Sequence, residues 1–292
     1  MLNLSIPAKE YPISEATNIL DKNDWDVLII LDGCRWDVFN EVINEIYFNQ
    51  TVYLSPTERT GLIIEPIKVP FIISPASSSG EWLHTTFSGR KCKDIVYVTG
   101  TPWLTEYAIV TQPGQQHLGY NPFHEIVLGF KYETLDYSGT SNPTEMSRIA
   151  LETREKFPGK RLIVHNMQPH FPFIGAIPLK PADWESLRRE MFILDKTIVG
   201  EEHRFGEYKP ENSLWKVMKE GIITREEAWQ GYKENLKFVL KQIPEWKKLG
   251  KRVIISADHG ECFLDYGMDG HPSGMRIETL VKVPWFDLSV IK

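Results

Sequence analysis

Two short segments near opposite ends of the chain carry side chains that could do chemistry. The first is an apolar, β-branched run that leads into Asp32, and the second is a similar run that leads into Asp258 and His259. His271 follows His259 by twelve residues. Carboxylate oxygens and imidazole nitrogens are ligands that divalent transition metals take in proteins. The sequence therefore predicts a metal site, provided that the fold brings the two segments together.

Buried strands are the elements that must position these residues. A short run of apolar, β-branched residues is typical of a strand inside a parallel sheet, and such strands present functional side chains at their carboxyl ends. We expect strands over Trp25–Leu31, Ile95–Thr99, Arg161–His165 and Arg252–Ala257.

Helical patterns lie between the expected strands. Asn142–Pro143 is a start signal for a helix that ends before Pro158. A capping box at Thr224 begins another helix, whose apolar stripe runs over Trp229–Ile243. Helix followed by buried strand, several times over, predicts an α/β fold. We expect a three-layer α/β/α sandwich with a mostly parallel central sheet.

The chain contains no linker rich enough in proline, glycine or serine to divide it, so we expect one domain over residues 1–292. Two stretches, at about 100–141 and 200–221, show little periodicity and are interpreted as insertions. Long irregular segments in a compact domain often cover or shape a site. Ordinary surface loops fit the same stretches equally well.

The overall composition argues against several classes of function. A formal net charge of −6 argues against nonspecific nucleic-acid binding, which needs a basic surface. The apolar runs are far shorter than the roughly 20 residues that cross a bilayer, and the first residues do not resemble a signal peptide. The three cysteines show no redox or metal spacing. We therefore expect no nucleic-acid partner, no membrane span and a cytoplasmic location.

The two segments together resemble the sulfatase-like branch of the alkaline phosphatase superfamily, which includes sulfatases, lipoteichoic acid synthases and phosphoethanolamine transferases. This resemblance implies an alkaline-phosphatase-like fold. It also implies that Asp32, Asp258 and His259 hold a divalent metal, together with a Ser, Thr or formylglycine nucleophile at the start of a helix. Zn²⁺ and Mn²⁺ suit such ligands best, and Mg²⁺ or Ca²⁺ remains compatible.

The resemblance identifies Ser79 as the nucleophile and as a further metal ligand. In sulfatases a Gly-Arg pair follows the nucleophile by ten and eleven residues, and Gly89-Arg90 stands at that distance from Ser79. A hydroxyl at a helix amino terminus lies among free N–H groups that favour an anionic oxygen. Ser77 and Ser78 are the alternative candidates.

The residues after Ser79 separate subclasses of the family. Sulfatases that use formylglycine carry Pro and Arg at the second and fourth positions after the nucleophile, where this sequence has Glu81 and Leu83. We therefore expect an unmodified serine, which suits phosphoryl transfer through a phosphoserine.

A third polar segment follows the strand expected over Arg161–His165. The family has a similar His-x-Pro segment whose histidine touches the substrate or a second metal, and the matching position is His170. His271 matches the spacing of a late histidine in phosphoethanolamine transferases. The resemblance thus implies that His170 and His271 bind a second metal or the phosphoryl oxygens.

Other residues are expected to play supporting roles. The Asp-x-x-x-His motif that holds the second zinc in two-metal relatives is missing, so we expect one tightly bound metal. His165 is expected behind the ligands, and Glu261 is expected to orient His259. Arg35 could reach a phosphoryl group, although an ion pair with Asp37 fits equally well.

The sequence therefore favours a metal-dependent phosphoesterase or phosphotransferase. Ser79 would attack phosphorus, while the metal, His170 and His271 stabilise the phosphoryl oxygens. The expected partner is an anionic small-molecule or glycan phosphate ester. Sulfuric ester hydrolysis, or catalytically silent binding of an anionic glycan, are the alternatives, and the oligomeric state cannot be read from the sequence.

Overall fold

A computed structural model of the protein describes most of the chain. The described residues are 8–22, 24–48, 50–53, 61–101, 103–104, 118, 120–131, 141–171, 173–174, 214–221 and 223–291. Large parts of the two expected insertions, residues 105–117, 132–140 and 200–213, lie outside these ranges.

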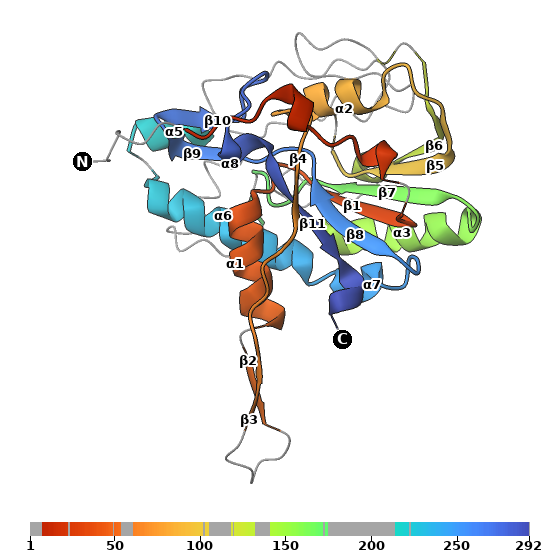
Figure 1. Ribbon diagram of the computed structural model, residues 1–292, viewed down its shortest axis with the longest axis horizontal. Helices are drawn as coiled ribbons and strands as arrows, with labels where there is room; N and C mark the ends of the chain where they lie inside the picture. The colour runs from red at the N-terminus through yellow and green to blue at the C-terminus, as the bar shows by residue number, and fades with distance from the viewer. Residues whose placement is uncertain are drawn as a thin grey trace.

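The centre of the fold is a sheet that has seven strands among the described residues, in the order β4-β11-β8-β1-β7-β5-β6 (Figure 1). β1, β5, β6, β7 and β8 run parallel, whereas β11 is antiparallel to both β8 and β4. The mostly parallel central sheet expected from the sequence is confirmed. The strands are β1 (Val27–Leu31), β4 (Phe71–Ile73), β5 (Cys92–Thr99), β6 (Phe123–Leu128), β7 (Arg161–Asn166), β8 (Val253–Ala257) and β11 (Lys282–Asp287).

The four strands expected from the sequence are β1, β5, β7 and β8, and all are present. Every residue of β1 and β8 is buried, because each strand lies between neighbours and has both faces covered. β4, β6 and β11, which lie toward the two sides of the sheet, were not expected from the sequence. β4 has three residues, and β6 contains exposed His124 and Glu125, so neither shows a continuous apolar run.

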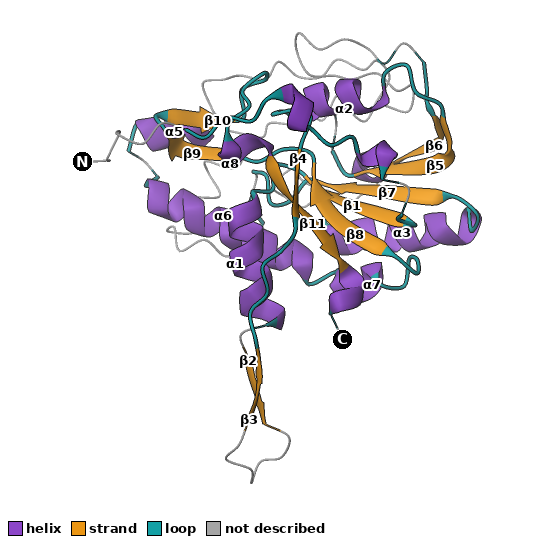
Figure 2. Ribbon diagram, viewed as in Figure 1, coloured by secondary structure: helices purple, strands orange, loops and turns teal. Residues whose placement is uncertain are grey.

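Helices cover both faces of this sheet, as expected for a three-layer α/β/α sandwich. Figure 2 shows α2 on one side of the sheet and α1, α3, α6 and α7 on the other. The helices are α1 (Trp36–Tyr47), α2 (Ser79–Phe87), α3 (Pro143–Lys156), α5 (Leu214–Lys219), α6 (Arg225–Leu240), α7 (Ile243–Trp246) and α8 (Glu278–Val281). Short 3-10 turns are η1 (Ile13–Glu15), η2 (Ile19–Asp21), η3 (Gly129–Lys131) and η6 (Leu288–Val290).

Two helices begin where the sequence predicts. The Asn142 side chain accepts a hydrogen bond from the backbone N–H of Thr144 at the start of α3. Thr224 and Glu227 form the reciprocal capping box of α6. These caps satisfy N–H groups that have no partner inside the helix, and so they fix the first turn. α2, by contrast, begins at Ser79 without a side-chain cap.

Two antiparallel hairpins leave the central sheet. β2 (Gln50–Tyr53) and β3 (Gly61–Ile64) extend away from the rest of the molecule (Figure 1). β9 (Cys262–Asp265) and β10 (Met268–Gly270) follow shortly after β8 and pair with each other. The turn of this second hairpin contains Tyr266 and Gly267, both with positive φ.

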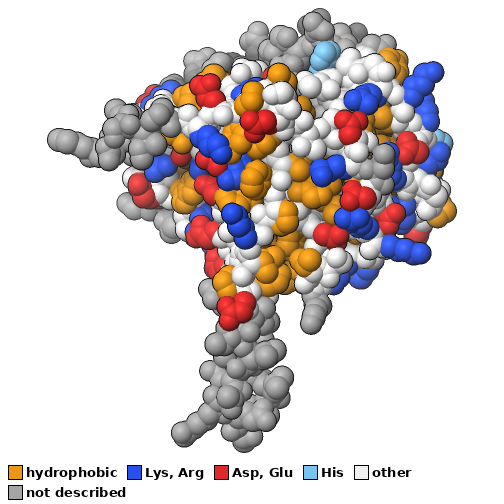
Figure 3. All heavy atoms as spheres, in the orientation of Figure 1, with side chains coloured by type: hydrophobic (Ala, Val, Ile, Leu, Met, Phe, Trp, Pro, Cys, Tyr) orange, Lys and Arg blue, Asp and Glu red, His pale blue; other side chains and the backbone are white. Residues whose placement is uncertain are grey.

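The exterior of the molecule carries charges of both signs. On the face shown in Figure 3, basic and acidic side chains are interspersed, without a continuous basic area. Among the described residues, no helix combines the length and the apolar composition that crossing a membrane would require.

Candidate metal centre and active site

The carboxyl ends of β1 and β8 meet because these strands are parallel neighbours in register. Leu31 pairs with Ala257, so Asp32 and Asp258 emerge at the same edge of the sheet. The backbone N–H of Gly33 donates to Asp258 Oδ1 at 3.1 Å and thereby joins the two loops. The structure thus brings together the two segments that the sequence singled out.

Ser79 reaches this edge from the first turn of α2. Its side chain is buried, and its Oγ lies 3.3 Å from Asp32 Oδ2 and 3.1 Å from His259 Nε2. All four residues predicted as metal ligands therefore lie together. We call Asp32, Ser79, Asp258 and His259 the first cluster.

The two preceding serines point elsewhere. The Ser77 hydroxyl donates to the backbone oxygen of Pro272 at 2.8 Å and accepts from the N–H of Met275 at 3.1 Å. Ser78 Oγ lies 2.7 Å from Ser273 Oγ. Of the three consecutive serines, the last is the one whose hydroxyl contacts the first cluster.

The first cluster presents donor atoms that fit a divalent cation. In the described part of the chain, Asp32 Oδ1 and Asp258 Oδ2 are buried and have no hydrogen-bond partner. His259 Nε2 lies 3.5 Å from each of them. His259 Nδ1 lies 2.7 Å from the carbonyl oxygen of Gly260, so it donates there and leaves the Nε2 lone pair facing the carboxylates. Because unpartnered buried carboxylate oxygens are costly, this arrangement favours a bound cation.

The ionisation of the side chains in the site also favours a bound cation. Burial, and then the neighbouring carboxylates of Asp258 and Glu261, raise the pKa of Asp32 well above its ordinary value. Burial also lowers the pKa of His259, which keeps this imidazole neutral. Within the described ranges, no Lys or Arg side chain forms an ion pair with these three carboxylates. Glu261 is paired with His271, whereas Asp32 and Asp258 have no Lys or Arg counterion among the described residues.

His165 lies directly behind the first cluster, at the end of β7. Its Nε2 is 3.6 Å from Asp258 Oδ2, and its Nδ1 is 2.7 Å from the Tyr97 hydroxyl. Burial lowers the pKa of His165 to about 4, so the ring is neutral. Asp32, His165 and Asp258 also present three donor atoms within 4.8 Å of one another.

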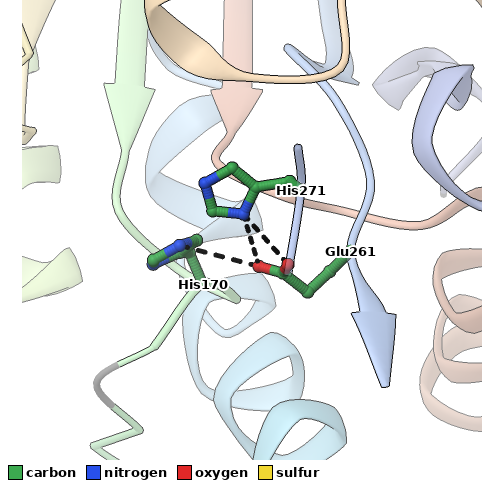
Figure 4. A group of neighbouring side chains, drawn as sticks. All are labelled: His170, Glu261 and His271. Carbon is green, nitrogen blue, oxygen red and sulfur yellow. Dashed lines mark hydrogen bonds and ion pairs between the residues drawn. The ribbon is translucent and has the colours of Figure 1, made fainter. Parts of the chain in front are cut away.

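A second group of possible ligands lies beside the first. His271 Nδ1 is 2.9 Å from Glu261 Oε1, and His170 Nε2 is 3.6 Å from Glu261 Oε2 (Figure 4). Ligand atoms of all three residues lie within 4.8 Å of one another. We call His170, Glu261 and His271 the second cluster. The rings of His259 and His271 are 4.5 Å apart, so the two clusters adjoin.

The β9–β10 hairpin explains why Glu261 and His271 meet. Cys262 pairs with Gly270, so the residues just outside this pair, Glu261 and His271, face each other. The expectation that Glu261 orients His259 is not what the structure shows, because its carboxylate is paired with His271. The Tyr266–Gly267 turn signal, flanked by residues able to form strands, could have revealed this pairing.

Arg35 does not serve as a phosphoryl-binding residue in this arrangement. Its Nη2 donates to Asp37 at 2.7 Å and its Nη1 to Asp265 at 2.8 Å, and Nη1 also lies 3.2 Å from the backbone oxygen of Glu261. The guanidinium group lies over the ring of Trp229. Of the two roles considered for Arg35, the ion pair with Asp37 is the one observed, and the guanidinium also supports the hairpin.

Trp103 is a contact that sequence reasoning missed. Its indole Nε1 donates to Asp32 Oδ2 at 3.2 Å, next to the Ser79 hydroxyl. Trp103 lies within the stretch interpreted as an insertion at 100–141, so part of that stretch reaches the site. A lone tryptophan in an aperiodic segment carries no signal for such a contact.

Several solved structures to which this chain is similar are phosphoethanolamine transferases. Lipooligosaccharide phosphoethanolamine transferase A from Neisseria meningitidis, an integral membrane protein, is 14% identical, with a TM-score of 0.48 over 89% of this chain and 47% of that one. This chain therefore spans about half the length of that protein. No protein-family profile and no curated protein sequence matches the chain.

Two further similar structures are periplasmic domains of phosphoethanolamine transferase EptC. The domain from Campylobacter jejuni is 11% identical, with a TM-score of 0.43 over 89% of this chain and 78% of that one. The domain from Escherichia coli, a complex with Zn, is 12% identical, with a TM-score of 0.38 over 89% and 72%. These neighbours are phosphoethanolamine transferases, a class within the branch that the sequence resembles.

The cytoplasmic location expected from the sequence is contradicted by this comparison. The two EptC structures are described as periplasmic domains. The expectation rested partly on the first residues of the chain, and residues 1–7 lie outside the described ranges.

Proposed function

We propose that this protein transfers or hydrolyses a phosphate ester through Ser79, with a divalent metal held by the first cluster. The observation that carries the proposal is the position of Ser79 Oγ, 3.3 Å from Asp32 and 3.1 Å from His259, at the amino terminus of α2. A nearby cation lowers the pKa of such a hydroxyl, and the helix N–H groups favour an anionic oxygen. This is the environment of an activated nucleophile.

The ligands of the metal would be Asp32, Ser79, Asp258 and His259. Two carboxylates, an imidazole and a hydroxyl suit Zn²⁺ or Mn²⁺ better than Mg²⁺ or Ca²⁺, which prefer oxygen ligands alone. When bound, the metal would supply Lewis-acid stabilisation of negative charge on the serine and phosphoryl oxygens.

Ser79 would act by direct displacement at phosphorus. Its Oγ forms a bond to phosphorus as the ester P–O bond opposite breaks, and the alcohol departs. Water or a second alcohol then attacks the phosphoserine and releases Ser79. The substrate class is therefore an anionic phosphate ester, with hydrolysis and transfer differing only in the acceptor.

The second cluster would contact the phosphoryl oxygens and donate a proton to the leaving group. Burial lowers the pKa of His271, but the adjacent Glu261 carboxylate outweighs burial and raises that pKa above its ordinary value. His271 is therefore suited to protonate the departing oxygen. His170, whose pKa burial lowers to about 4, is a neutral imidazole that can contact phosphoryl oxygens or help hold a second cation.

The test is turnover of p-nitrophenyl phosphate, bis-p-nitrophenyl phosphate and p-nitrophenyl sulfate by chelated protein, with Zn²⁺, Mn²⁺, Mg²⁺ or Ca²⁺ added back. We expect metal-dependent cleavage of a phosphate ester by the wild-type protein. Cleavage of the sulfate alone would replace the proposal with sulfuric ester hydrolysis. Metal binding with no turnover of any ester, in the presence of alcohol acceptors, would favour a non-catalytic binding protein.

A further inference from the structure

Helix α6 contacts the loops that carry both clusters, although none of its residues belongs to either one. Tyr232 and Asn235 make these contacts, and both side chains are fully buried. Residues three apart in a helix lie on the same face, so the two side chains reach the two loops from one surface of α6.

Tyr232 fixes the turn that follows β1. Its hydroxyl donates to the backbone oxygen of Gly33 at 2.6 Å and accepts from the N–H of Arg35 at 2.9 Å. Gly33 has a φ of +63°, and a Cβ added there would lie 3.4 Å from Glu261 and from His170. The positive φ favours glycine at this position, and the Tyr232 hydroxyl joins the residues on the two sides of the turn.

Asn235 fixes the loop that follows β7. Its Nδ2 donates to the backbone oxygens of Pro169 and His170 at 3.1 and 3.0 Å, and its Oδ1 accepts from the N–H of Ile174 at 3.1 Å. The N–H of His170 in turn donates to the backbone oxygen of Asp32 at 3.1 Å. One amide thus holds the backbone of a residue of the second cluster.

α6 is itself held in place. A capping box closes its first turn, and Lys233 and Lys237 pair with Glu41 and Glu45 of α1. Buried backbone N–H and C=O groups are costly unless hydrogen-bonded, and Tyr232 and Asn235 supply those partners to the two loops. The polar side chains are explained if their hydrogen bonds set the positions of the two loops.

We propose that Tyr232 and Asn235 are positioning residues for the two clusters, Tyr232 acting through the Asp32 turn and Asn235 through the His170 loop. This inference rests on the proposed function. Tyr232 supports metal binding, because Asp32 is a ligand of the first cluster. Asn235 supports contact with the substrate, because His170 belongs to the second.

The experiment compares Tyr232→Phe and Asn235→Asp with wild-type protein and with Thr153→Val. The first variant removes only the hydroxyl, and the second replaces the amide donor with an acceptor of the same shape. Thr153 donates a buried hydrogen bond at 2.7 Å within α3, so Thr153→Val removes a comparable bond away from the site. Zn²⁺ affinity is measured by competition with a chelator, alongside kcat and KM for the phosphate ester that the wild type cleaves.

We expect Tyr232→Phe to weaken Zn²⁺ binding by about tenfold. This is the lower end of the loss that follows removal of residues that orient metal ligands. Excess Zn²⁺ should then restore kcat. Asn235→Asp should leave this affinity within about twofold of wild type while KM rises by about tenfold. If Asn235→Asp does not fold, Asn235→Leu, which removes the amide without adding charge, is measured in its place.

The inference is overturned if Tyr232→Phe binds Zn²⁺ as tightly as Thr153→Val does. It is equally overturned if both α6 variants change Zn²⁺ affinity and KM in parallel with their loss of thermal stability. Failure of the proposed function looks different, because the wild-type protein itself would then bind no Zn²⁺ or cleave no phosphate ester.

Discussion

The two clusters adjoin, yet they are built in different ways. The first joins the ends of two parallel strands to the start of α2, and its four side chains are almost completely buried. The second joins the loop after β7 to the two ends of a hairpin, and the side chains of His170 and His271 are 16% and 21% exposed. One cluster is thus set by the sheet, and the other by loops at its edge.

The difference extends to their hydrogen bonds. Among the described residues, the first cluster leaves Asp32 Oδ1 and Asp258 Oδ2 without hydrogen-bond partners, whereas the second pairs Glu261 with His271. Unpartnered donors fixed by strands form a preorganised cation site, because little has to rearrange on binding. A partly exposed, internally paired group is better suited to a substrate that arrives and leaves. The following predictions test this division of roles.

Loss of the nucleophile should have the largest effect. Ser79→Ala should lower kcat by a factor on the order of a thousand or more, because the attacking oxygen is removed. Ser78→Ala is the matched control, since its hydroxyl contacts Ser273 and not the first cluster. Steady-state kinetics with circular dichroism to verify folding makes the measurement. A larger loss in the control would move the nucleophile by one residue.

Loss of a first-cluster ligand should remove the metal. Loss of a residue that hydrogen-bonds a metal ligand weakens metal binding by roughly 10- to 100-fold. Asp258→Asn removes a ligand itself, so its effect should be larger. Metal content after dialysis, measured by mass spectrometry, gives the readout. Asp287→Asn is the control, because Asp287 pairs with Arg252 away from the site. Unchanged metal content in Asp258→Asn would remove Asp258 from the ligand set.

Disruption of the second cluster should separate substrate contact from metal binding. Glu261→Gln removes the charge that orients His271 and raises its pKa. Thus kcat should fall and KM for a phosphate ester should rise by about tenfold, while the first metal stays bound. Glu245→Gln, which alters an ion pair with Lys248 elsewhere, is the control. Loss of the metal in Glu261→Gln would show that the clusters are not functionally separable.

Lowering the pH should protonate Asp32 of the first cluster before it protonates Glu261 of the second. Because the pKa of Asp32 is raised, metal binding must release a proton, and affinity should fall as pH falls, by up to about tenfold per unit for each proton displaced. Burial raises the pKa of Glu261, but His271 outweighs it and lowers that pKa below its ordinary value, so Glu261 stays ionised. Calorimetric titration in buffers of different ionisation enthalpy counts the protons. Absence of proton release would contradict the raised pKa of Asp32.

Much of the central fold could be predicted from the sequence. The continuous apolar runs of β1 and β8, and the caps of α3 and α6, are local patterns that directly reflect two covered faces and a helix start. Resemblance to a known family supplied Ser79, because three adjacent serines are equivalent as local sequence. The strands at the sides of the sheet were missed, since short or half-exposed strands lack such a pattern.

The second cluster was only half predictable. His170 and His271 were expected near the substrate, but Glu261 was assigned to His259, because adjacency in sequence says nothing about a hairpin register. Arg35 likewise had two possible partners, a phosphoryl group or Asp37. In the structure it pairs with the carboxylates of Asp37 and Asp265.

The sequence by itself determined which residues end the strands and what chemistry those residues can do, because strand patterning and side-chain type are local properties. Only the tertiary structure decided that the donors fall into two adjoining clusters, that Trp103 reaches Asp32, and that Tyr232 and Asn235 hold both loops. The physical reason is that these contacts join residues far apart in sequence. Their geometry is set by the order of the strands in the sheet and by the packing of α6, which no single segment encodes.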